Sequence, residues 1–185
     1  ENVDGCEVDD APPAYTTVTE LREAGLTITD NCGLQEAVTS EQTSTGSCPI
    51  VITRTYTVKD LCGRSTTVSQ TINVNDNEAP TIGAGNLNTT LTSTDCNFTL
   101  PDFTAAVRAI SSDNCTAKNN LEITQNPAGT TYTPGTTPQT VTVTVTVKDA
   151  CGNPSTKDIV VTIPAALTAS ATATPASICN GDTAQ

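Results

Sequence analysis

Residues 140–147 read Thr-Val-Thr-Val-Thr-Val-Thr-Val, a strict alternation of hydroxyl and apolar side chains. Successive side chains of a β-strand point to opposite faces, so this stretch predicts a strand with a buried valine face and a wet threonine face. Apolar side chains alternate again at Ile159, Val161 and Ile163. The intervening residues 149–153, Asp-Ala-Cys-Gly-Asn, have the composition of a hairpin turn and predict that the two strands pair.

The first part of the chain carries the same pattern. Residues 50–58 alternate between apolar and polar side chains, and a second strand is predicted over 68–74 after the turn-forming segment 60–63. Arg54 interrupts the apolar face of the first of these strands. Two interpretations of this arginine are open: it marks an end of the sheet, or it takes part in a salt bridge.

The two halves are related by an internal repeat. Three markers recur in the same order, at offsets of 83 to 90 residues: Gly5-Cys6 with Asp95-Cys96, Thr29–Cys32 with Ser112–Cys115, and Val58–Gly63 with Val147–Gly152. We therefore expect two tandem modules, residues 1–77 and 78–164. Residues 165–185 are rich in small side chains, and we interpret them as the start of a third, truncated module or as a linker.

A short helix is predicted near the start of each module. Thr17-x-x-Glu20 matches a capping box, Val18 and Leu21 are at helical spacing, and Gly25 can end the helix. The counterpart in the second module is 103–109. With strands dominating and helices this short, the expected fold class is all-β, built from tandem immunoglobulin-like antiparallel β-sandwiches.

Composition excludes several functions. The chain of 185 residues has a net charge of −12, which argues against binding nucleic acid or anionic membrane surfaces. It contains no histidine, and no apolar run approaches the length of about 18 residues that spans a bilayer. Since no side chains form a credible nucleophile and base pair, we expect that the protein is not an enzyme.

Eight cysteines are present, and no two are spaced as a Cys-x-x-Cys pair. A zinc site made of cysteines alone normally needs such pairs, so we interpret these residues as structural disulfides. Disulfides persist in oxidising compartments, which predicts a secreted, periplasmic or cell-surface protein.

Several strings together resemble a known repeat: Asp30–Gly33, Ser47–Pro49, Thr53–Gly63 and Asn75–Pro80. They are similar to hyalin (HYR) repeats, a branch of the immunoglobulin-like fold. Such repeats are abundant in giant surface proteins of Bacteroidota, including gliding-motility-associated adhesins exported by the type IX secretion system. The second module departs from the pattern, because it has no counterpart of Cys48.

The resemblance implies a stalk or spacer segment on the bacterial cell surface. Its partners would be neighbouring repeats of the same long chain and an unknown surface, glycan or protein. Two alternatives are open: a glycan- or protein-binding module, and an accessory domain of a secreted hydrolase. The three tyrosines are few and dispersed in the sequence, which gives the glycan alternative little support.

The immunoglobulin-like topology implies disulfide pairs, because its B–C and F–G loops lie at one end. We expect the pairs Cys32–Cys62 and Cys115–Cys151 at that end, and Cys6–Cys48 at the opposite end. For Cys96 and Cys179 three outcomes are open: they pair with each other, Cys96 is free, or Cys179 pairs beyond residue 185.

Carboxylates flank the disulfide loops and the expected junction. The string Asn73–Pro80 resembles the cadherin linker, which holds calcium between immunoglobulin-like domains. Calcium prefers oxygen ligands, so the candidate ligands are the acidic and amide residues of these loops: Asp30, Asp60, Asn75, Asp76, Asp113 and Asp149. The competing interpretation is turn chemistry alone, since Asp and Asn also cap turns. Calcium together with Pro80 would stiffen a rod of modules in line.

Overall fold

The computed structural model describes residues 1–92, 97–168 and 177–178. The chain divides into two compact units, Glu1–Asn77 and Glu78–Gln185, and the division falls at the junction that the repeat predicts. Both units are built mainly of β-strands with one short α-helix each, so the all-β class is confirmed.

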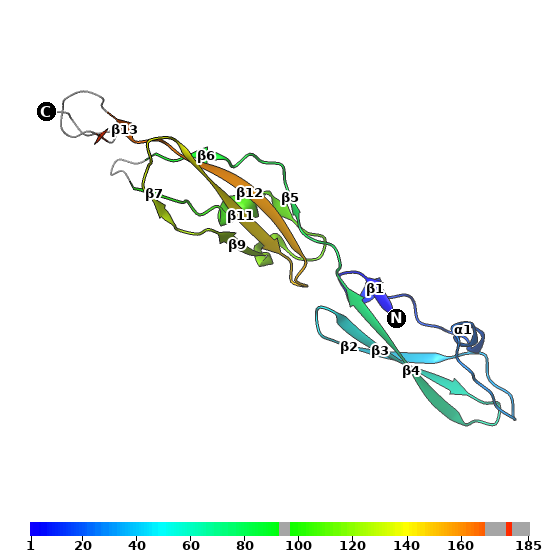
Figure 1. Cartoon of the computed structure of the whole chain (residues 1–185). Helices are drawn as coiled ribbons and strands as arrows, with labels where there is room; N and C mark the ends of the chain where they lie inside the picture. Colours follow the sequence, from blue (N-terminus) through cyan, green and yellow to red (C-terminus); the bar gives the residue numbers. More distant parts are fainter. Residues whose placement is uncertain (93–96, 169–176, 179–185) are drawn as a thin grey trace. The chain divides into compact units, whose positions relative to one another are not determined.

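The first unit contains one four-stranded sheet (Figure 1). Its order is β1-β4-β3-β2, and β3 and β4 form a long hairpin registered from Ile50 opposite Val74 to Lys59 opposite Ser65. The strands expected over 50–58 and 68–74 are therefore confirmed and extend a little further. The elements are β1 (Asn2–Asp4), a 3-10 turn (Val8–Asp10), α1 (Val18–Glu23), β2 (Thr39–Thr45), β3 (Ile50–Lys59) and β4 (Ser65–Asn75).

The capping box of α1 is confirmed. Thr17 Oγ1 accepts a hydrogen bond from the Glu20 backbone N–H, and the Glu20 carboxylate in turn accepts from the Thr17 N–H. The backbone N–H of Thr16 also donates to Glu20 Oε2, at 2.7 Å. Gly25 follows with φ of 96°, the left-handed conformation in which glycine commonly ends a helix.

This carboxylate makes the first unit sensitive to acid. The hydrogen bond from the Thr16 backbone, with further bonds from Thr16 and Thr17, lowers the pKa of Glu20 below its usual value. A lowered pKa in the folded state gives stability that is present above the unfolded pKa, about 4.3, and is lost as the pH falls through the folded pKa. We expect Glu20→Gln to lose less stability than the wild type between neutral pH and strong acid. Urea unfolding at each pH measures this, with Glu23→Gln in the same helix as the control; parallel losses in wild type and Glu20→Gln would contradict it.

The core of the first unit is in two parts. One cluster packs α1 against the sheet and consists of Val18, Leu21, Val38, Tyr56 and Val58. The other lies further along β3 and β4 and consists of Ile52, Ile72 and Val74, with Val3, Val8, Ala11 and Ile50 packed against it.

The second unit repeats the central hairpin with β11 (Gln139–Lys148) and β12 (Pro154–Ile163), in a sheet of order β6-β12-β11-β9. Two-stranded pairs, β10-β7 and β5-β8, accompany this sheet. The other elements are β5 (Thr81–Ile82), β6 (Thr89–Thr90), β7 (Phe98–Thr99), α2 (Thr104–Ile110), β8 (Ser111–Ser112), a 3-10 turn (Lys118–Asn120), β9 (Glu122–Asn126) and β10 (Thr131–Tyr132). The helix expected over 103–109 is confirmed as α2.

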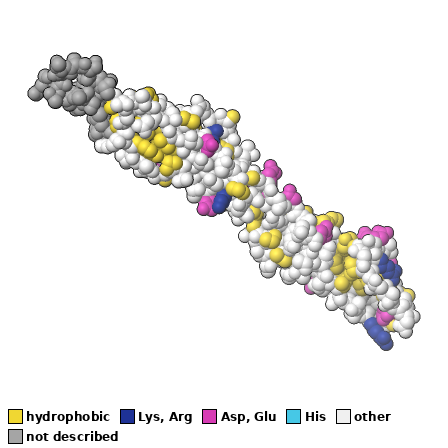
Figure 2. Space-filling model, viewed as in Figure 1, with side chains coloured by type: hydrophobic (Ala, Val, Ile, Leu, Met, Phe, Trp, Pro, Cys, Tyr) yellow, Lys and Arg dark blue, Asp and Glu magenta, His cyan; other side chains and the backbone are white. Residues whose placement is uncertain are grey.

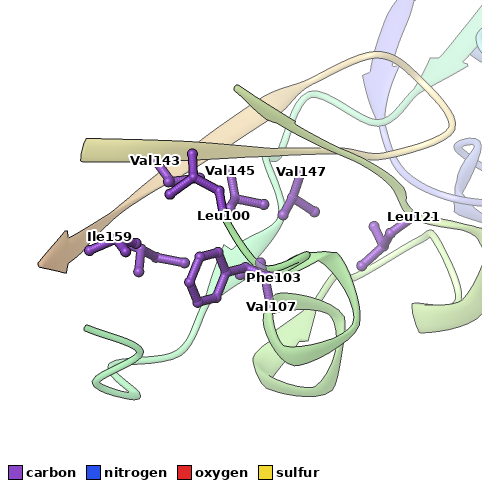
Figure 3. Packing of buried hydrophobic residues seen from close by; sticks show 9 residues of the cluster. Leu100, Phe103, Val107, Leu121, Val143, Val145, Val147 and Ile159 are labelled. Atoms are coloured by element: carbon purple, nitrogen blue, oxygen red, sulfur yellow. The ribbon is translucent and has the colours of Figure 1, made fainter. Parts of the chain in front are cut away.

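Among the described residues of this unit, the buried core forms one main cluster. Figure 3 shows Val143, Val145 and Val147 of β11 lying over Phe103 and Val107. Most of the valine face of the alternating stretch is buried, as the sequence predicts: Val143, Val145 and Val147 are 0% exposed, and Val141 is half-buried. Leu100, Leu121, Ile159 and Val161 complete the buried cluster.

The expectation of purely antiparallel sheets is wrong at two edges. β1 pairs in parallel with β4, and β6 pairs in parallel with β12. Parallel neighbours need a long connection, and in the first unit residues 5–64, which contain α1, β2 and β3, connect β1 to β4. Of the expected third module, β13 (Leu167–Thr168) and β14 (Ser177–Ile178) pair with each other, and the rest of residues 169–185 lies outside the described residues.

A candidate carboxylate metal site

The turn between β11 and β12 holds Asp149 in a fixed orientation. Its Oδ1 accepts the backbone N–H of Asn153 at 2.8 Å, and its Oδ2 accepts the Asn153 side-chain amide at 2.6 Å. Asp149 is 5% exposed. An aspartate that caps its own turn in this way is the expected chemistry of such a hairpin.

Asp113 follows β8 and also caps a turn, but with only one of its oxygens. Its Oδ2 accepts the backbone N–H groups of Cys115 and Thr116, at 3.0 and 2.7 Å. Its Oδ1 is buried and, within the described part of the chain, has no hydrogen-bond partner. The Ala150 N–H donates to Thr116 Oγ1 at 3.0 Å, which joins this loop to the Asp149 turn.

Asp76 comes directly after β4 and is 1% exposed. The Asn153 side-chain amide that contacts Asp149 also donates to the Glu78 carbonyl, at 3.3 Å. The chain just after Asp76 is thereby held beside the Asp149 turn. One carboxylate oxygen each of Asp76, Asp113 and Asp149 lies within 4.8 Å of the others.

Three carboxylates this close repel one another when all are ionised. A cation bound among them removes that repulsion, and a purely oxygen donor set suits the hard cations calcium and magnesium rather than metals that prefer sulfur or imidazole. Asp113 Oδ1, which caps nothing, is the oxygen best placed to serve as a ligand. Turn capping would therefore not prevent metal binding in this loop, because Asp113 caps the turn with Oδ2 and leaves Oδ1 available.

The structure brings together half of the six candidate ligands. Asn75 lies next to the site in sequence, but its side-chain amide donates to the Asp76 carbonyl and to Asn77 Oδ1, at 3.2 and 2.8 Å. Asp30 and Asp60 cap turns in the first unit. Asp30 accepts from the Cys32 N–H and Asp60 from the Arg64 N–H, both at 2.7 Å. Neither belongs to a group of three potential metal ligands among the described residues.

Sequence reasoning missed Asn153, which fixes both the Asp149 carboxylate and the segment after Asp76. A comparison of the two copies of the repeat could have indicated this residue. Asn153 aligns with Arg64, so the two copies differ at the position that follows the Cys-Gly pair of each repeat.

The disulfide between Cys32 and Cys62 is confirmed, with a Cα–Cα distance of 6.2 Å. Four other cysteines are also disulfide-bonded: Cys6, Cys48, Cys115 and Cys151. The bond from Ala150 to Thr116 lies directly beside Cys115 and Cys151, which supports pairing those two. Cys96 and Cys179 lie outside the described residues.

Mass mapping of unreduced peptides tests the remaining pairs. We expect one linked peptide that joins Cys6 to Cys48 and another that joins Cys115 to Cys151, because each pair then closes within one compact unit. Recovery of a peptide that links Cys48 to Cys115 would contradict this pairing. The confirmed Cys32–Cys62 peptide is the internal standard for the digestion.

No protein-family model matches the chain, and no curated protein sequence matches it either. Within the described residues, neither helix has the length and apolar character needed to cross a membrane. The class of protein that the fold and the disulfides define is an all-β, disulfide-bonded chain of two units.

Proposed function

We propose that this chain is a structural repeat segment of a large secreted or surface-anchored adhesive protein, in which it serves as a stalk or spacer. The observation that carries the proposal is the repetition itself. Two compact units follow one another, each has the same long central hairpin, and each has a disulfide-bonded cysteine in the turn of that hairpin. A chain of similar units is a simple way to build length, and disulfides suit an oxidising exterior.

The units are HYR-like members of the immunoglobulin-like fold in this proposal, exported to the surface of a bacterium of the Bacteroidota. The strings that resemble the HYR repeat support it, and they lie at structurally equivalent places. Asp60–Gly63 and Asp149–Gly152 each form the turn of the central hairpin. Surface display is tested by protease treatment and antibody labelling of intact cells that make the full-length protein. Labelling only after cell lysis would overturn it.

The proposal includes calcium as the cation of the carboxylate site. Calcium takes six to eight oxygens with flexible geometry, and the three aspartates offer up to six carboxylate oxygens. Backbone carbonyls and water complete such shells in extracellular modules, whose dissociation constants are about 10⁻⁴ to 10⁻³ M. The buried Oδ1 of Asp113 supports a ligand at this place.

Calorimetric titration of the intact chain with calcium tests this part directly. We expect one site, lost in Asp113→Asn and retained in Asp30→Asn, because Asp30 caps the equivalent turn of the first unit but joins no carboxylate cluster among the described residues. Equal calcium binding by both variants would show that the calcium site lies elsewhere in the chain. No binding by the wild type would remove calcium from the proposal and leave the stalk unaffected.

A further inference from the structure

A row of polar side chains crosses the middle of the first unit's sheet. Arg54 on β3 lies opposite Gln42 on β2 and opposite Gln70 on β4. The two hydrophobic clusters of this unit lie on either side of that row, one containing Tyr56 and the other Ile52. The polar row therefore separates what would otherwise be one core.

The second unit shows that the fold does not require this row. The repeat aligns Arg54 with Val143 and Gln70 with Ile159. Val143 and Ile159 lie opposite each other in the hairpin and are both 0% exposed. They belong to a single continuous core (Figure 3). A pair of apolar residues at this place is the ordinary solution, so the polar pair needs a reason other than folding.

Arg54 is a buried cation with most of its hydrogen-bonding capacity unused. The side chain is only 5% exposed, and its Nε donates to Gln42 Oε1 at 2.9 Å. Among the residues that the structure describes, its two Nη atoms have no hydrogen-bond or ion-pair partner. Among the described residues, neither Nη atom is one of the fully enclosed side-chain atoms that lack a partner, so the guanidinium still reaches solvent and is open to a ligand.

Arg54 lines a cavity of about 250 Å³. One wall is the rigid segment Pro12-Pro13-Ala14-Tyr15, and the remaining lining residues are Glu20, Arg54 and Gln70. A neighbouring cavity of about 420 Å³ shares Tyr15 and Gln70 and adds Tyr56, whose ring centroid lies 5.7 Å from that of Tyr15. Two of the three tyrosines, dispersed in sequence, thus meet beside the buried arginine.

We propose that this cavity binds a carboxylate carried on a single sugar ring, that is, a hexuronate. Free Nη groups match a carboxylate with two parallel hydrogen bonds, which a neutral sugar cannot provide. The proline and tyrosine wall offers flat apolar surface to the ring, and Gln70 is held in place by Tyr56 Oη at 2.8 Å and by Glu1. A volume of 250 Å³ lies below the range of roughly 300–1,000 Å³ for drug-sized ligands and suits one ring.

Charge selects a monoanion over a polyanion. Glu20 also lines the cavity, and the chain as a whole carries a net charge of −12. A phosphate monoester carries a charge of about −1.5 to −2 at pH 7, which is more than a single guanidinium can balance beside this carboxylate. A uronate brings one.

The decisive variant is the double substitution Arg54→Val with Gln70→Ile, which installs the pair found in the second unit. Titration with glucuronate, followed by two-dimensional amide NMR, is expected to shift the signals of residues 14–15 and 70 of the wild type in the millimolar range. The double variant is expected to lose this response at least tenfold and to melt at a higher temperature than the wild type. A raised melting temperature shows that the variant is folded, so loss of binding then reports on the site.

Two further ligands limit the interpretation. Glucose, which has the ring without the charge, is expected to give no response, and acetate, which has the charge without the ring, is expected to bind at least tenfold more weakly than glucuronate. Three outcomes would overturn the site. They are a wild type that does not respond to glucuronate, a double variant that binds glucuronate as the wild type does, and glucose that binds as tightly as glucuronate. Acetate that binds as tightly as glucuronate would show that the sugar ring adds nothing to binding, and would overturn a hexuronate as the ligand.

Discussion

The melting temperature of the intact chain is expected to rise with free calcium, and Asp76→Asn and Asp149→Asn are each expected to lose most of that rise. A ligand that binds only the folded state stabilises it by about 2.7 kcal/mol at 100 times its dissociation constant. Each substitution removes one of three clustered carboxylates, two of which are almost completely buried. Calorimetric melting at several calcium concentrations, with a chelator as the zero point, measures the rise.

Two matched variants separate calcium binding from turn capping and from charge. Asp60→Asn removes the same kind of turn cap as Asp149→Asn, because Asp60 accepts the Arg64 N–H as Asp149 accepts the Asn153 N–H. Asp158→Asn removes a carboxylate of β12 that is exposed and bonded to Thr144. Both should keep the full rise with calcium. A melting temperature indifferent to millimolar calcium and to chelator would contradict the site, and turn capping would then be the whole role of these aspartates.

The central hairpins were predictable because their apolar side chains recur at every second residue. Residues 140–147 and 50–58 alternate so regularly that strand type, buried face and hairpin partner all follow from the printed sequence. The capping box at Thr17 and Glu20 predicted α1 for a similar reason, since it depends on two side chains at a fixed spacing.

The edge strands could not be predicted in this way. β2 reads Thr-Ser-Glu-Gln-Thr-Ser-Thr, and all seven residues are exposed, so it has no apolar face to reveal its period. β1 is three residues long and pairs in parallel with a strand some seventy residues later, a contact that local pattern does not encode. A strand that is held mainly by backbone pairing needs no particular side chains, so its sequence shows no recognisable pattern.

The carboxylate cluster was predictable from the repeat, and its details were not. The repeat placed Asp113 and Asp149 in loops expected to lie at one end, and the junction placed Asp76 nearby. Which oxygen caps a turn and which is left for a cation depends on loop geometry, as the two oxygens of Asp113 show. The sequence could not exclude Asp30 and Asp60, which have the same neighbours in the repeat.

Arg54 is the residue at which pattern and structure differ most. The interpretation that it marks an end of the sheet is wrong, because it lies in the middle of β3 and has strand partners on both sides. The salt-bridge interpretation also fails among the described residues, where its bonded partner is the neutral Gln42. A break in an otherwise regular period thus indicated a specialised position rather than a boundary.

The largest loss of stability is expected from removing the Cys32–Cys62 disulfide by substituting both cysteines with alanine. The bond joins residues 30 positions apart and closes a loop that contains β2 and β3. In the chain-entropy model a loop of this length contributes roughly 3 to 4 kcal/mol, by restricting the unfolded chain. A small unit with a divided core has little stability to spare, and about 4 to 8 °C of melting temperature is lost per kcal/mol in domains of this size.

Tyrosine emission can follow this loss in the first unit, because the chain has no tryptophan and two of its three tyrosines, Tyr15 and Tyr56, pack together there. In urea, the midpoint of the double variant should fall well below that of the wild type. Leu61→Ala is the control, since Leu61 lies in the same turn, is 66% exposed, and should change stability little. A double variant that unfolds at the wild-type midpoint would show that the unfolded chain is already compact around this loop, so that the bond restricts nothing. The stability of the first unit would then come from the hairpin and its two clusters alone.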